Sequence, residues 1–298
     1  MKHAALAVIA VVLALVLAAC GAPQASQSTS PPPPTSPPAA PTEVPTTGPT
    51  VAATATTLSG PLIVFAAASL TDAFEAIATA FEQAYPGTEI IFNFAGSQQL
   101  AAQINEGAPA DVFASANRSQ MEVAIEGGRV ISGTQQTFVR NRLVVITPSD
   151  NPAGITTLQD LTNPGLRLIL ADQAVPVGQY SLAFLARASA LPAYTENYSA
   201  TVLANVVSFE DNVRSVLTKV ALGEGDAGIV YSTDAALEAD NILQIAIPDE
   251  LNTIASYPIA PIADRANPAL AQAFIDFVLA PEGQQILVKY GFISPEGT

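Results

Sequence analysis

Short apolar runs alternate with segments of helical periodicity from about residue 61 to the end of the chain. Leu62–Phe65 is the first apolar run, and Phe74, Ile77 and Phe81 then recur at the three-to-four-residue spacing of a helix. The apolar run at 90–94 is likewise followed by a helical pattern. This succession predicts strands that are each followed by a helix, which is typical of an α/β fold with largely parallel sheets.

The alternation continues to the C-terminal region, where two helices are expected. Further strands are expected at 111–114, 143–147, 168–171, 206–208 and 227–231, with helices at 71–85, 98–106, 118–126, 270–279 and 281–289. Turn sequences separate several of these segments, as at Tyr85-Pro-Gly87.

Two strand-like runs, at 138–146 and 256–262, suit crossings between two lobes. Charged residues interrupt the first run, and prolines in the second suit an edge strand or a hinge. If both runs cross, residues 61–137 and 256–298 form one lobe and residues 141–253 form the other. Periodicity alone does not choose between this arrangement and one large domain.

The N-terminal sequence has the layout of an export signal. Met1–His3 is basic, and residues 4–19 are apolar without interruption but shorter than the ~20 residues of a spanning helix. Leu17-Ala-Ala-Cys20 resembles the lipobox of bacterial lipoproteins. The resemblance implies that residues 1–19 are a signal peptide and that Cys20, the only cysteine, carries a lipid. An uncleaved anchor or an ordinary secretory signal would export the chain as well.

The segment from Cys20 to Gly60 has the composition of a tether. It is rich in Pro, Ser, Thr and Ala, and Glu43 is its only charged residue. Such a segment cannot bury a core and is expected to be extended and disordered. A Pro-rich ligand for another protein is disfavoured because no basic residue flanks its PxxP sequences.

The charge balance excludes nucleic acid as a partner. The chain has 11 Lys and Arg against 26 Asp and Glu, and no basic cluster is present to neutralise phosphates. If the ligand is an anion, the long-range field of the protein repels it. Attraction must then come from local dipoles and hydrogen bonds.

Two serines, Ser69 and Ser97, lie where a predicted strand passes into a predicted helix. The start of a helix offers unpaired N–H groups and a partial positive charge, and a serine adds a hydroxyl donor. Two such starts that face one cleft would bind an oxyanion without a charged side chain. The alternative interpretation is that both serines are ordinary N-caps.

Other motifs extend this pattern along the chain. They are Gly107-Ala-Pro-Ala-Asp-Val-Phe, the Pro/Gly loop at 171–180, Asn212-Val-Arg, and Gly228-Ile-Val-Tyr-Ser-Thr-Asp-Ala. With Phe65-Ala-Ala-Ala-Ser-Leu-Thr and the terminal Tyr290-Gly-Phe, their order and spacing resemble the periplasmic molybdate-binding proteins of ABC transporters. The resemblance covers residues 61–298.

The resemblance implies a type II periplasmic-binding-protein fold, with two lobes, two hinge crossings and the ligand in the cleft. It also implies the ligand-binding residues: hydroxyls and backbone N–H groups of Ser69 and Ser97 from one lobe, and backbone N–H groups of Val177 and Val213 with the phenol of Tyr231 from the other.

The sequence departs from the family pattern at two positions near the predicted site. Gly96 stands where relatives often carry a polar residue, and Val177 stands where some carry Ala. Because position 177 would act through its backbone, the change bears on pocket shape more than on binding.

A site made only of donors distinguishes among oxyanions. Phosphate near neutral pH carries a proton that needs an acceptor, whereas molybdate, tungstate and sulfate do not. Molybdate or tungstate is the expected ligand, and another oxyanion (sulfate or phosphate) or a small organic anion is the alternative.

Several residues near these motifs also have structural interpretations. Tyr231 can be a packing residue, and Tyr180 is expected to pack rather than line the pocket. Arg214 is expected to pair with a carboxylate, and the acidic residues Asp111, Asp211 and Asp234 are expected to be caps or turn residues.

Catalysis is the competing class of function, and the composition disfavours it. A serine nucleophile usually needs a His or Lys base, and the only histidine is His3 in the predicted signal. An iron-binding protein would need adjacent tyrosines, whereas Ser232 follows Tyr231. We expect no enzyme activity, no cofactor and no metal except as the oxyanion.

The expected protein is therefore an exported, monomeric binding component of an ABC importer. It would be attached through Cys20 to the outer face of the cytoplasmic membrane and would deliver its anion to the permease.

Overall fold

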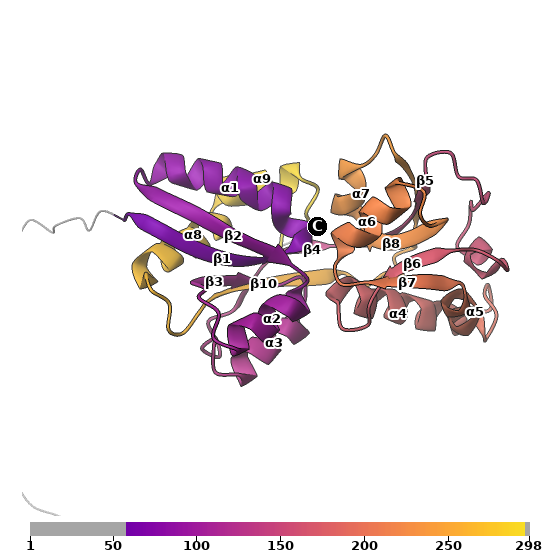
Figure 1. The fold of residues 1–298 in the computed structure, drawn as a ribbon, viewed down its shortest axis with the longest axis horizontal. Helices are drawn as coiled ribbons and strands as arrows, with labels where there is room; N and C mark the ends of the chain where they lie inside the picture. The colour runs from indigo at the N-terminus through magenta and orange to yellow at the C-terminus, as the bar shows by residue number, and fades with distance from the viewer. Residues whose placement is uncertain (1–57, 296–298) are drawn as a thin grey trace, which may run out of the picture. The chain divides into compact units, whose positions relative to one another are not determined.

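The computed structural model describes residues 58–295, which contain two five-stranded sheets flanked by helices (Figure 1). The predicted signal peptide, Cys20 and nearly all of the predicted tether lie outside these residues. The α/β architecture predicted from the sequence is confirmed. No helix between residues 58 and 295 has the length and apolar character needed to cross a membrane.

The first sheet has the strand order β2-β1-β3-β10-β4, and its first three strands are parallel. Strand β10 runs antiparallel to both of its neighbours. The strands are β1 (Gly60–Ala67), β2 (Thr88–Ala95), β3 (Val112–Ala114), β4 (Gln136–Asn141) and β10 (Ala255–Pro261).

Helices cover both faces of the first sheet, with α1 and α9 on one side and α2 and α3 on the other (Figure 1). The core under α1 is aromatic: Phe74 packs against Phe92, Phe138 and Phe274 with ring centroids 5.7 to 6.1 Å apart. The helices are α1 (Thr71–Ala84), α2 (Ser97–Asn105), α3 (Arg118–Glu126), α8 (Pro268–Leu279) and α9 (Pro281–Lys289).

The second sheet has the order β7-β6-β8-β5-β9. Strand β6 is parallel to β7 and β8, whereas β5 is antiparallel to β8 and β9. Its strands are β5 (Leu143–Pro148), β6 (Leu168–Ala171), β7 (Val206–Glu210), β8 (Ala227–Tyr231) and β9 (Ile242–Ala246), and its helices are α4 (Pro176–Ser189), α5 (Tyr198–Ala204), α6 (Val213–Ala221) and α7 (Ser232–Leu237).

The chain passes between the sheets twice. The predicted strand at 138–146 is two strands in different sheets, because β4 ends at Asn141 and β5 begins at Leu143. The return passage lies between β9 and β10. We call residues 60–141 and 255–295 the first lobe and residues 143–246 the second lobe. The first sheet thus continues through Asn141, beyond the limit of 137 expected from the pattern.

Parallel strands place their carboxyl ends at one edge of each sheet. In the first lobe β1 ends at Ala67 and β2 at Ala95, and each is followed directly by a helical turn. In the second lobe β6, β7 and β8 end at Ala171, Glu210 and Tyr231. Ligands of open α/β sheets bind outside such carboxyl ends.

Candidate anion-binding site

The carboxyl ends of the strands in both lobes border one small cavity. Its size suits a small solute rather than a drug-sized molecule. All five residues predicted to bind the ligand line it. The full lining is Ala67, Ala68, Ser69, Ala95, Gly96, Ser97, Ala116, Val175, Pro176, Val177, Asn212, Val213 and Tyr231.

The first lobe contributes two buried serines, and neither is an N-cap. Ser69 lies in a short 3-10 helix, Ala68–Leu70, that precedes α1, and Leu70 is the N-cap of α1. Ser97 is the first residue of α2, whose N-cap is Gly96. The alternative interpretation of both serines as ordinary caps is therefore wrong.

Each serine oxygen has one partner inside the first lobe. Ser97 Oγ accepts a hydrogen bond from the Ala116 backbone N–H at 3.0 Å, and Ser69 Oγ lies 3.0 Å from the Tyr257 hydroxyl oxygen. Ala116 follows β3, the third parallel strand of the sheet. Contacts within the first lobe thus hold both serines at the edge of the first sheet that faces the second lobe.

The second lobe contributes two helix starts. Helix α4 begins at Pro176 after the N-cap Val175, and α6 begins at Val213 after the N-cap Asn212. Backbone N–H groups in the first turn of a helix have no partner within the helix. Val177 and Val213 line the cavity, lie in these first turns and have buried side chains.

Tyr231, at the end of β8, is 1% exposed, and its hydroxyl has no hydrogen-bond partner among residues 58–295. Burial, with the neighbouring Tyr257 as a smaller cause, raises the pKa of the Tyr231 phenol well above its ordinary value. The phenol is therefore a neutral donor. Its ring also packs edge-on against Tyr257 at 5.8 Å, so Tyr231 has a packing role as well.

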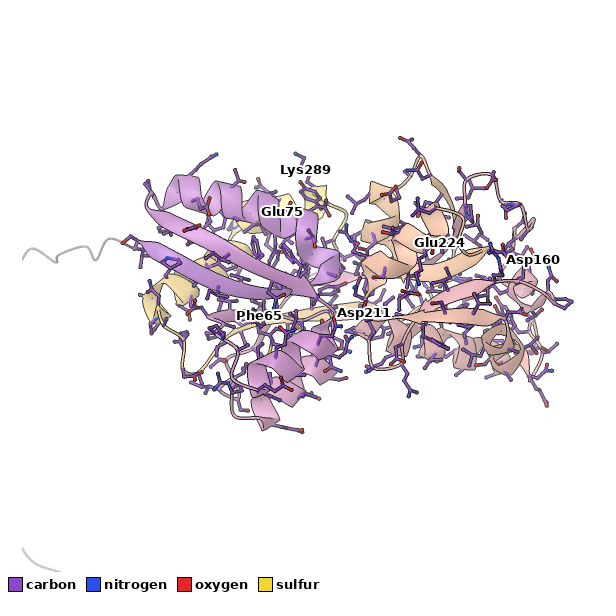
Figure 2. All side chains as sticks on the ribbon, viewed as in Figure 1. Phe65, Glu75, Asp160, Asp211, Glu224 and Lys289 are labelled. Carbon is purple, nitrogen blue, oxygen red and sulfur yellow. The ribbon has the colours of Figure 1, made fainter. Side chains whose placement is uncertain are left out.

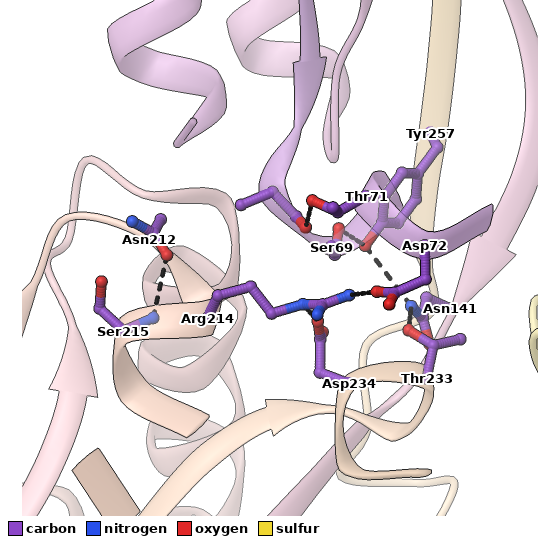
Figure 3. Close-up of polar contacts among 11 residues, drawn as sticks. Ser69, Thr71, Asp72, Asn141, Asn212, Arg214, Ser215, Thr233, Asp234 and Tyr257 are labelled. Carbon is purple, nitrogen blue, oxygen red and sulfur yellow. Dashed lines mark hydrogen bonds and ion pairs between the residues drawn. The ribbon is translucent and has the colours of Figure 1, made fainter. Parts of the chain in front are cut away.

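Arg214 does not line the cavity and is neutralised by two carboxylates. Its Nε donates to Asp234 and its terminal nitrogen donates to Asp72, both at 2.6 Å (Figure 3). The predicted pairing of Arg214 is confirmed. Asp234, in the first turn of α7, is also the buried partner of this cation, and burial raises its pKa to about 6. Since Asp72 belongs to α1, the ion pair also joins the two lobes.

Hydrogen bonds between the lobes also join residues near the cavity. Gln98 Nε2 donates to the Asp211 carbonyl at 2.7 Å, and Gln99 Nε2 donates to the Asp211 carboxylate at 3.0 Å. Asn117 Nδ2 donates to Gln179 Oε1 at 3.0 Å. Asp211 lies at the junction of the lobes in Figure 2.

The backbones of the two lobes approach closely at Gly96. A Cβ atom at this position would lie 2.3 Å from the Asp211 carbonyl oxygen, although the φ of −60° suits any residue. The departure from the family pattern noted at Gly96 therefore coincides with a point where the lobes leave no room for a side chain.

Two other residues singled out in the sequence lie away from the cavity. Asp111 accepts hydrogen bonds from the backbone N–H groups of Ile63 and Ala266, both at 2.9 Å, and so has the structural role expected of it. Tyr180 is partly buried, does not line the cavity, and has its pKa raised to about 12 by burial.

Comparison with known proteins identifies the family of the chain. Residues 62–293 match the family described as bacterial extracellular solute-binding protein. The molybdate-binding protein ModA of Mycobacterium tuberculosis is 37% identical over 78% of this chain and 85% of its own length. ModA of Escherichia coli is 34% identical over 78% of this chain and 89% of its own length.

The chain belongs to the bacterial extracellular solute-binding proteins. The fold agrees with this assignment: the structure of the periplasmic molybdate-binding protein of Azotobacter vinelandii matches with a TM-score of 0.67 and 21% identity, over 78% of this chain and 99% of that one. Members of this family bind solutes outside the cytoplasm, which accords with a cavity built between two lobes.

The chemistry of the cavity follows from its lining. No Asp, Glu, Lys or Arg side chain lines it, and no group of three His, Cys, Asp or Glu residues that could hold a metal ion occurs within residues 58–295. The residues that line it include three with hydroxyl side chains and the first-turn residues of two helices, and these groups can donate hydrogen bonds. Such a surface suits a ligand whose surface consists of hydrogen-bond acceptors.

Proposed function

We propose that this protein is the extracytoplasmic substrate-binding component of an ABC importer that takes up molybdate, and tungstate as its close analogue. The observation that carries the proposal is the uncharged, donor-lined cavity in which Ser69, Ser97 and Tyr231 meet the first turns of α4 and α6. The relatives named molybdate-binding proteins support the choice of ligand.

Hydrogen bonds alone are sufficient for tight binding. A buried dianion must have its oxygens hydrogen-bonded, and each bond to a charged group contributes ~1.5–3 kcal/mol. About five to seven such bonds, less the cost of association, reach the ~12 kcal/mol that corresponds to nanomolar affinity. The hydroxyls of Ser69, Ser97 and Tyr231 and the N–H groups of Ser69, Ser97, Val177 and Val213 supply that number.

Delivery to a permease requires that the lobes separate and approach again. Residues of both lobes line the cavity, and the ion pair between Arg214 and Asp72 joins the lobes. A hinge motion at the two passages between the sheets would open the cavity. The proposal includes lipid attachment at Cys20, a position on the outer face of the cytoplasmic membrane, and action as a monomer without cofactor or catalysis.

The test is calorimetric titration of the purified chain with molybdate, tungstate, sulfate and phosphate. The proposal expects tight binding of molybdate and tungstate and little response to sulfate and phosphate. A ligand that binds only the folded protein also raises the melting temperature, which provides a second readout. Tight binding of sulfate or phosphate instead would assign another oxyanion, and no response to any of the four would overturn the proposal.

A further inference from the structure

A buried tyrosine outside the cavity lining lies within hydrogen-bond distance of one of the two cavity serines. Tyr257, on β10, is fully buried, and its hydroxyl oxygen lies 3.0 Å from Ser69 Oγ (Figure 3). The same oxygen lies 3.5 Å from Asn141 Nδ2. Tyr257 and Asn141 belong to β10 and β4, neighbouring strands of the first sheet that lie at the two passages between the lobes.

The orientation of the Asn141 side-chain amide can be assigned from its neighbours. The backbone N–H of Arg142, which can only donate, points at Asn141 Oδ1 at 2.9 Å and so identifies that atom as the amide oxygen. The amide nitrogen therefore faces the other way, where it donates to Thr233 Oγ1 at 2.8 Å and to the Tyr257 oxygen. Because the Tyr257 oxygen accepts from Asn141, its own O–H is free to donate to Ser69.

This order determines what Ser69 can offer to a ligand. With Tyr257 as the donor, Ser69 Oγ accepts through one of its two lone pairs, and its single hydrogen is free to point into the cavity. Ser97 reaches the same state differently, since its oxygen accepts from the Ala116 N–H. Both serines therefore present hydrogens to the ligand.

We propose that Tyr257 is a positioning residue of the anion site, which orients Ser69 as a donor to the ligand and so favours tetrahedral oxyanions that carry no proton. The inference rests on the proposed function and adds the residue that enforces the selectivity. An anion with an O–H group needs an acceptor, and a Ser69 hydroxyl whose hydrogen is directed into the cavity presents a donor in that place.

The roles of the ring and of the hydroxyl of Tyr257 can be tested separately. The ring packs edge-on against Phe138, Tyr231 and Phe292 with centroids 5.7 to 6.4 Å apart, and a phenylalanine ring would keep these contacts. Only the hydroxyl reaches Ser69. Tyr257→Phe therefore removes the control of Ser69 while it preserves the packing.

The experiment compares two anions of similar size and equal charge at slightly alkaline pH. Selenate carries no proton and hydrogen arsenate carries one. Both are titrated, with molybdate, into the full chain purified in detergent, as the wild type and as Tyr257→Phe. Tyr198→Phe is the matched control, because Tyr198 is equally buried and its hydroxyl donates to the Leu158 carbonyl, away from the cavity.

We expect Tyr257→Phe to bind molybdate about tenfold more weakly, the effect of one hydrogen bond. The preference for selenate over hydrogen arsenate should fall by a similar factor, because the released Ser69 hydroxyl can rotate and accept. Tyr198→Phe should keep both the affinity and the preference of the wild type.

Two results would overturn the inference while the proposed function stands: unchanged affinities in Tyr257→Phe, or equal weakening for selenate and arsenate, which loosened packing alone would produce. A wild type that prefers an oxyanion other than molybdate would overturn the proposed ligand but leave the selenate-to-arsenate comparison decisive for Tyr257. A wild type that binds no oxyanion would overturn both.

Discussion

The two walls of the cavity are built by different means. The first lobe presents side-chain hydroxyls, those of Ser69 and Ser97, each held by a hydrogen bond from behind. The second lobe presents the first turns of α4 and α6, where Val177 and Val213 have buried side chains. Tyr231 is the exception, a second-lobe side chain with an unpartnered hydroxyl.

Because of this difference, substitutions test the hydroxyls of the first wall more directly than the backbone groups of the second wall. Hydroxyls depend on residue type, so an alanine removes them. A backbone N–H survives every substitution except proline, so residue type at 177 and 213 affects the site through shape alone. Residue types at 177 and 213 therefore give little indication that these positions belong to the site, although the second wall faces the same ligand.

The largest effect is expected from Ser69→Ala combined with Ser97→Ala, which removes both hydroxyls of the first wall. Loss of two hydrogen bonds to a charged ligand, at ~1.5–3 kcal/mol each, weakens binding about 10²- to 10⁴-fold. Calorimetry with molybdate measures the change, and thermal unfolding without ligand shows whether the fold persists.

Ser189→Ala is a matched control for the double variant, because that serine donates to the Leu185 carbonyl within α4 and does not line the cavity. It should bind molybdate like the wild type. Unchanged affinity in the double serine variant would show that the first wall does not contact the ligand.

Val213→Pro tests one backbone donor of the second wall. Val213 is the first residue of α6, where proline is well tolerated, and Asn212 before it has extended φ and ψ of −158° and 167°, which suit a residue before proline. Loss of one N–H to a charged ligand should weaken binding about 10- to 100-fold. Calorimetry measures this change as well.

The control for that test is Val213→Ala, which keeps the N–H and removes only buried methyl groups. It should lower the melting temperature but keep the affinity nearly unchanged. If the proline and alanine variants bind equally well, the backbone of Val213 is not a ligand.

Gly96→Ala is expected to have the smallest effect, and it tests how the walls meet. The added Cβ would lie 2.3 Å from the Asp211 carbonyl oxygen of the other lobe, so the lobes cannot approach as closely. Affinity for molybdate should fall by about tenfold or less. The melting temperature without ligand should change little, since the φ of Gly96 suits alanine. An affinity equal to that of the wild type would show that close approach at Gly96 is not needed for binding.

Local patterns predicted most of the fold, and their failures have physical causes. The helical spacing of Phe74, Ile77 and Phe81 correctly predicted α1, whose core face they form. The edge strand β9 was missed because three of its five residues are exposed and its pattern is mixed. The run at 138–146 looks continuous in sequence, and only the pairing of strands shows that it divides at Arg142.

The candidate site shows more clearly that local sequence patterns do not predict long-range contacts. Motifs and family resemblance selected five residues that the fold brings to one cavity. They did not select Tyr257, whose partner Ser69 lies 188 residues away in sequence. No local pattern marks such a pair, because the partner of the Tyr257 hydroxyl lies in the short 3-10 helix after β1, far away in the sequence.

The position of β10 inside the first sheet has a consequence for the order of folding. This strand lies between β3 and β4, so β4 has no neighbour in the sheet until residues 255–261 are available. The second lobe is continuous in sequence and is complete once β9 has been made. A chain that emerges from its N-terminus can therefore finish its second lobe first. The serine wall, although earlier in the sequence, acquires the strand that holds Ser69 only near the end of chain emergence.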